Sequence, residues 1–148
     1  MLFAASLLAS SVAIGLSLTT LNNIRQAVGS IYSDYSNLHL LGLNELNEYI
    51  KRIDLTRHLE ILDSILKKVV INSPSIDMAV LSIKEAVDEI NEQLKSMKER
   101  IEYNSKLWIK LPYRAYRFYN LTERLRKAFE LLKEREKTLK MTLQLIKT

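Results

Sequence analysis

The sequence contains no cysteine, and glycine and proline are rare, with three and two residues among 148. The absence of cysteine excludes disulfide frameworks, thiolate nucleophiles and cysteine-based zinc sites. The scarcity of glycine and proline leaves few points at which a helix must break. A chain built mostly from long helices is therefore expected.

Motifs that carry catalysis are also missing. There is no P-loop, no glycine-rich nucleotide turn and no serine nucleophile elbow. The two histidines, His39 and His58, have no Asp or Glu around them at the spacing of metal ligands. We therefore expect no enzyme: no catalytic, cofactor-binding or metal-binding residues, and no cofactor.

The start of the chain lacks charge, because residues 1–24 carry no ionisable side chain. Large apolar residues fall on all sides of a helix drawn from Leu2 to Leu21, and a helix without a polar face is normally buried all round. Twenty helical residues rise about 30 Å, which matches the hydrocarbon core of a bilayer. The pattern predicts one apolar N-terminal helix over residues 1–37, embedded in a membrane or buried in an assembly, that continues into the rest of the fold.

Small residues recur at every fourth position of this segment. Ala5, Ala9, Ala13 and Ser17 form one row, and Gly15 belongs to a second. Small residues four apart let two helix backbones approach closely. We therefore expect these five residues to form a helix-packing or oligomer contact; the alternative is that they only fill space.

Apolar residues spaced three and four positions apart continue through the rest of the chain. They predict helices over about 44–71, 74–110 and 112–147, with a break near Asp54 where the spacing changes phase. The clearest pattern lies in 74–110, where strict alternation of four and three is typical of a coiled-coil seam. That seam consists of Ile76, Val80, Ile83, Val87, Ile90, Leu94, Met97 and Ile101.

Long helices joined by short connections pack as antiparallel neighbours. The sequence therefore predicts an all-α fold: a long antiparallel bundle of about four helices with coiled-coil-like heptad seams. Residues 44–148 would form a charged three-helix portion beside the apolar N-terminal helix. Ser73 suits the N-cap of the third helix and Pro74 its first position, which marks one boundary clearly.

One stretch concentrates aromatic and basic residues. Between Glu102 and Glu123 there is no acidic residue, and six of the aromatic residues lie between Tyr103 and Tyr119. Such a mixture suits a membrane interface, a nucleic-acid surface or a protein–protein contact, whereas the plainer alternative is a helix corner with its rings packed inward. The residues expected to contact a partner or an anionic surface are Lys106, Trp108, Lys110, Tyr113, Arg114, Tyr116 and Arg117.

Charge is distributed unevenly along the chain. Residues 1–94 carry seven basic and eleven acidic side chains, whereas residues 95–148 carry fifteen and six. This asymmetry indicates an anionic partner for the C-terminal half, or the acidic half of another copy; a solvated basic helix face is the alternative.

Three functional hypotheses follow. The first is a non-enzymatic structural protein: a self-associating helical bundle in a membrane-associated or virion-type assembly. Its partners would be other copies of the chain or other assembly subunits, together with membrane lipid. The second is a nucleic-acid-coating protein that uses the basic C-terminal half, and the third is a membrane-active pore or lysis protein. The expected location is a membrane or the inside of a large particle such as a virion.

Overall fold

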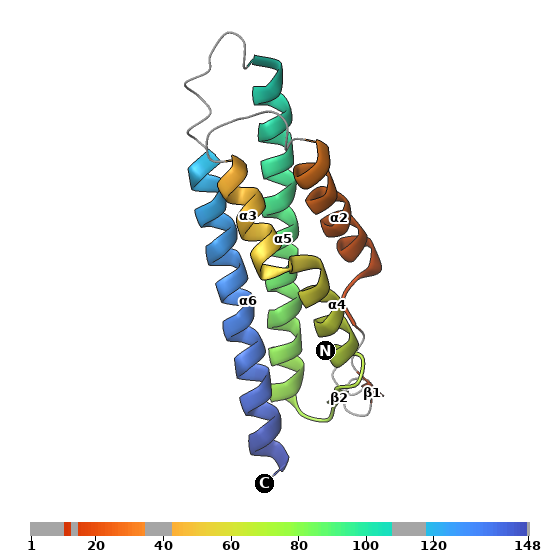
Figure 1. The fold of residues 1–148 in the computed structure, drawn as a ribbon. Coiled ribbons are helices and arrows are strands. Elements are labelled where there is room, and N and C mark those ends of the chain that lie inside the picture. The colour runs from red at the N-terminus through yellow and green to blue at the C-terminus, as the bar shows by residue number, and fades with distance from the viewer. Residues whose placement is uncertain (1–10, 13–14, 35–42, 108–117, 148) are drawn as a thin grey trace.

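The computed structural model describes residues 11–12, 15–34, 43–107 and 118–147, and within them the protein is mostly helical (Figure 1). The helices pack against one another around a single cluster of buried apolar side chains. The elements, in chain order, are β1 Ser11–Val12, α2 Leu18–Gly29, a π-helical turn η1 Ser30–Asp34, α3 Leu43–Ile53, α4 Leu55–Leu66, β2 Val70–Ile71, α5 Pro74–Leu107 and α6 Phe118–Lys147.

The two longest helices, α5 and α6, lie side by side and run in opposite directions (Figure 1). α2 packs on α5, and α3 packs on α6. All eight seam positions predicted within 74–110 are buried, none more than 2% exposed. Each such aliphatic side chain contributes about 1.5–3 kcal/mol by leaving water.

The predicted start of α5 is confirmed. Pro74 is its first residue, and the hydroxyl of Ser73 accepts a hydrogen bond from the N–H of Ile76 at 3.3 Å. Proline suits this position because its missing N–H would have no helical partner there. The described part of α5 ends at Leu107, and that of the last helix begins at Phe118.

The predicted break near Asp54 is also confirmed. Asp54 has φ 48° and ψ 56°, in the left-handed region, and separates α3 from α4. Asp tolerates this conformation better than most residues with a Cβ atom. The residue therefore turns the chain without a proline or glycine.

The prediction of one continuous helix over residues 1–37 is wrong for residues 11–12 and 15–17. Ser11 and Val12 form a strand that pairs antiparallel with Ile71 and Val70, and α2 begins only at Leu18. The helix predicted over 44–71 likewise ends at Leu66. Val69, Val70 and Ile71 are β-branched, which favours the extended backbone of β2.

Candidate functional site

Most of the large apolar side chains that remain exposed lie at one end of the molecule. At this end α4 and α6 finish, β2 lies and α5 begins (Figure 1). We call this region the apolar end, and its exposed side chains are Ile61, Ile65, Val70, Met78, Leu81, Met141, Leu145 and Ile146. Leu145 is the most exposed of them at 74%. Apolar surface gathered in one region, rather than scattered singly, is typical of an interaction site.

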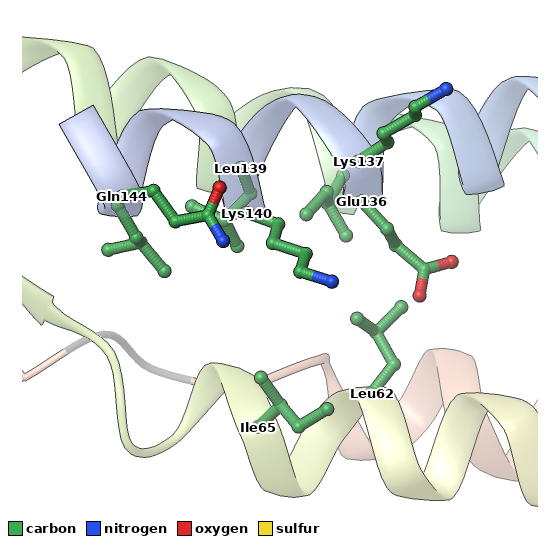
Figure 2. Close-up of a pocket in the computed structure, with 9 residues that line it drawn as sticks. Leu62, Ile65, Glu136, Lys137, Leu139, Lys140 and Gln144 are labelled. Atoms are coloured by element: carbon green, nitrogen blue, oxygen red, sulfur yellow. The ribbon is translucent and has the colours of Figure 1, made fainter.

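A groove opens between α4 and α6 within this region. Figure 2 shows Leu62 and Ile65 of α4 facing Leu139, Lys140 and Gln144 of α6 across an open space. Its cavity volume is about 510 Å³, within the range of roughly 300–1,000 Å³ typical of ligand pockets. We call this cavity the α4–α6 groove, and it is lined by Leu62, Ile65, Ile83, Glu136, Lys137, Leu139, Lys140, Leu143 and Gln144.

The groove exists because the chain changes direction at Asp54. Before this residue α3 packs on α6, and after it α4 packs on α2 instead. Beyond His58, α4 diverges from α6, and Leu143 of α6 is only partly buried, whereas Leu139 stays buried. Ile65 is 50% exposed although it lines the groove, so water reaches an apolar wall.

A polar contact lies beside the groove. One ring nitrogen of His58, Nε2, lies 2.8 Å from Oε2 of Glu136, and both side chains are partly buried. The His58 ring also meets Phe129 edge-on, with 5.0 Å between ring centroids. These contacts hold the start of α4 to α6 and give His58 a structural role.

The chain segment before α2 lies against a different side of α4. The N–H of Leu16 donates a hydrogen bond to Oδ1 of Asp63 at 2.7 Å, and Nζ of Lys67 lies 3.0 Å from Oδ2. Gly15 is required here, because a Cβ atom would overlap the Asp63 carboxylate. Asp63 and Ile65 are two residues apart, which places them about 200° apart around the helix axis. The N-terminal segment is thus attached opposite the groove.

Two of the five small residues predicted to form a contact are described. Gly15 is buried against Asp63 and Lys67 in non-helical backbone. Ser17 caps α2, and its hydroxyl accepts a hydrogen bond from the N–H of Thr20 at 3.4 Å. The expectation that they lie on a helical row is therefore wrong at these two positions, because the helix starts after both. Ala5, Ala9 and Ala13 lie outside the described residues, and an oligomer contact stays a prediction.

The predicted aromatic and basic contact falls largely outside the described residues. Lys106 lies in the last turn of α5. The remaining predicted members, Trp108, Lys110, Tyr113, Arg114, Tyr116 and Arg117, belong to the range 108–117, which the structure does not describe. Contact of this stretch with a partner stays a prediction.

The basic residues at the start of α6 have acidic and aromatic neighbours. Arg126 pairs with Glu123, and its guanidinium lies 5.1 Å from the centre of the Tyr49 ring. Arg124 and Lys127 line a second, shallower groove together with Glu85 and Glu89 of α5. A phosphate backbone approaching this face would meet carboxylates as well as cations, so the described geometry gives the nucleic-acid hypothesis little support.

Other features of the described residues bear on function as follows. No group of three or more His, Asp or Glu side chains there lies close enough to hold a metal ion. None of the helices in these ranges is both long and apolar enough to cross a bilayer.

Comparison of the chain with protein-family models, curated proteins and solved structures gave no match. The apolar end and its groove are therefore the strongest candidate site.

Proposed function

We propose that this protein is a non-enzymatic structural subunit: a long antiparallel helical bundle with coiled-coil-like seams that self-associates through its apolar end. The supporting observation is the set of exposed isoleucine, leucine and methionine side chains on the elements that meet at the apolar end, one of which, Ile65, also lines the α4–α6 groove. Burying one such side chain fully is worth about 1.5–3 kcal/mol. Several of them buried together favour association even after the loss of rotational and translational freedom.

The start of the described chain supports the same proposal. β1 pairs with β2 at the apolar end, so residues 1–10 join the folded part there. Because this segment has no charged side chain and five large apolar ones, an apolar interface or membrane suits it best. We therefore propose a membrane-associated or virion-type particle in which the apolar ends are shielded from water.

The experiment is a mass measurement in solution. The full chain is examined by light scattering and analytical ultracentrifugation without detergent, over a range of protein concentrations. We expect oligomers, and we expect the variant with Leu145→Glu and Ile146→Glu to shift toward the monomer. Both side chains are substantially exposed in the single chain, so folding should survive their replacement.

A matched control is available on the same helix. Leu131 is 42% exposed but lies away from the apolar end, beside Arg124 and Lys127. Leu131→Glu should leave the oligomer unchanged. A full-length chain that stays monomeric without detergent at every concentration contradicts the proposed function, and so does an equal loss of mass in both variants.

A further inference from the structure

We propose that the α4–α6 groove is the docking site for residues 1–10 of a second copy of this chain. The inference rests on the proposed self-association and adds its physical mode, which is an exchange of N-terminal segments. Each copy would fill the groove of the other, as in a two-fold symmetric dimer in which the same surfaces meet.

The chemistry of the segment matches that of the groove. Residues 1–10 read MLFAASLLAS, with five large apolar side chains and no charged side chain. The walls of the groove are formed by Leu62, Ile65, Ile83, Leu139 and Leu143. A short apolar segment that anchors several side chains in a preformed groove is a recurrent mode of peptide recognition.

Polar groups at the groove suit a peptide rather than a lipid chain. Figure 2 shows the ends of the Lys140 and Gln144 side chains beside the open space between α4 and α6. An ammonium group donates hydrogen bonds, and an amide both donates and accepts them. A peptide backbone offers carbonyl and N–H groups to match, whereas the hydrocarbon part of a lipid offers neither.

The attachment point favours a second copy over the same chain. Gly15 and Leu16 are held on the Asp63 side of α4, about half a turn of the helix away from Ile65. Residues 1–10 leave the fold at Ser11, which pairs with Ile71 beyond the end of α4. The exposed side chains of the apolar end need cover from another molecule, and a second copy that meets this end brings its own β1, and the segment joined to it, to the groove in the same association.

The absence of cysteine permits a direct test by crosslinking. One preparation carries Leu7→Cys and another carries Ile65→Cys, and the two are mixed, dissociated, reassociated and mildly oxidised. We expect a disulfide-linked pair of different chains as the main product. The matched control replaces Ser64, which is exposed but does not line the groove. With Ser64→Cys in place of Ile65→Cys, the yield of the disulfide-linked pair should fall at least about tenfold, because the docked segment would contact residue 65 and not residue 64.

A second variant tests the groove without a crosslink. Ile65→Asp places a charge where the apolar segment would lie, on a side chain already 50% exposed, so the single chain should still fold. We expect the dissociation constant of the oligomer to rise roughly tenfold or more, since the nearby Lys140 does not fully compensate a carboxylate that loses its water under the apolar segment. Leu131→Asp should change it less than about twofold.

The outcomes separate this inference from the proposed function. An oligomer that forms but gives no disulfide between the Leu7→Cys and Ile65→Cys chains overturns the docking and leaves self-association standing. A closed monomer from a chain carrying both substitutions shows docking within one chain and overturns it as well. If the thiol of the Leu7→Cys variant is protected from a water-soluble reagent only when lipid vesicles are added, the segment belongs to a membrane and the docking is again overturned. A strictly monomeric chain contradicts the proposed function itself.

Discussion

The contact between Asp63 and the segment before α2 offers the sharpest test of the fold, because it determines where the N-terminal residues leave the protein. Asp63→Ala removes the carboxylate that accepts the N–H of Leu16 at 2.7 Å and pairs with Lys67. The Asp63 side chain is only 13% exposed, whereas that of Lys67 is 63% exposed. The hydrogen bond, and not the ion pair, should therefore dominate the cost.

The magnitudes follow from that difference in burial. A hydrogen bond to a charged partner contributes about 1.5–3 kcal/mol, and an exposed ion pair of this spacing about 0.3–0.5 kcal/mol. We expect Asp63→Ala to lower the free energy of unfolding by about 2–3 kcal/mol and Lys67→Ala by less than about 0.5 kcal/mol. Asp63→Asn keeps an acceptor oxygen without the charge and should cost about 1 kcal/mol.

Gly15→Ala provides an independent route to the same contact. The new Cβ atom would overlap the Asp63 carboxylate, so the carboxylate would have to move and its hydrogen bond to Leu16 would be lost. The cost should approach that of Asp63→Ala. In the Asp63→Ala background it should shrink, because the remaining neighbour is the flexible side chain of Lys67. The two changes should thus couple by about 1 kcal/mol or more in a double-mutant cycle.

Urea unfolding followed by circular dichroism measures these values. With a slope of about 2 kcal/mol/M, a loss of about 2 kcal/mol lowers the midpoint by about 1 M. The Leu16 amide should lose its protection from hydrogen exchange in Asp63→Ala and keep it in Glu60→Ala. The control is Glu60→Ala, on the same helix as Asp63, which removes an exposed ion pair of 3.3 Å between Glu60 and Arg25 of α2. If Asp63→Ala costs no more than Glu60→Ala, the N-terminal segment is not held as described.

Three further predictions concern other positions. Asp54→Val should lower the free energy of unfolding by about 1–2 kcal/mol, since a β-branched residue strains the left-handed backbone at φ 48°, whereas Asp54→Gly should stay within about 1 kcal/mol of the natural chain in the same urea assay. Thr122→Val should raise it by about 1 kcal/mol, because the buried Thr122 hydroxyl has no hydrogen-bond partner among the described residues; a decrease in the thermal midpoint would contradict this. Burial raises the pKa of Tyr49, and the guanidinium of Arg126 opposes that rise. The folded protein therefore binds the phenol proton of Tyr49 more tightly than the unfolded chain does. The stability that this difference provides is fully present below the ordinary pKa of about 10 and is lost as the pH rises beyond it. Tyr49→Phe should therefore reduce the decrease in the free energy of unfolding at alkaline pH.

The charged part of the chain was predictable because its signals are local. The start of α5 follows from Ser73 and Pro74, two adjacent residues with known preferences at helix ends. The break at Asp54 follows from a change of phase in the apolar spacing. Such signals span a few residues and need no knowledge of distant partners.

The first residues were mispredicted because their structure depends on contacts far away in sequence. Leu16 bonds to Asp63, and Ser11 pairs with Ile71, separations that no local pattern reveals. Absence of charge indicates burial but does not distinguish helix from strand. The groove was missed for a similar reason, since it arises where α4 leaves α6 and not from any motif. Asp54 was the available signal, because a change of direction implies a change of packing partner.

Residues 1–24, which carry no charged side chain, fall into two parts that differ in how far the chain itself covers their apolar side chains. From Gly15 onward three of the four large apolar side chains are covered by the chain's own helices, with Leu16 7%, Leu21 8% and Ile24 1% exposed, whereas Leu18 is 71% exposed. The sequence prediction assigned all 24 residues to a membrane or a neighbour, and that is wrong for Leu16, Leu21 and Ile24. The demand for an external apolar surface therefore concentrates on residues 1–10 and on the exposed side chains where α4 and α6 end. β1, to which residues 1–10 are joined, lies at the same end of the molecule as those exposed side chains. A single interface can therefore shield both the segment and the side chains from water. An association that buries only the segment, or only the side chains, should be weaker than one that buries both.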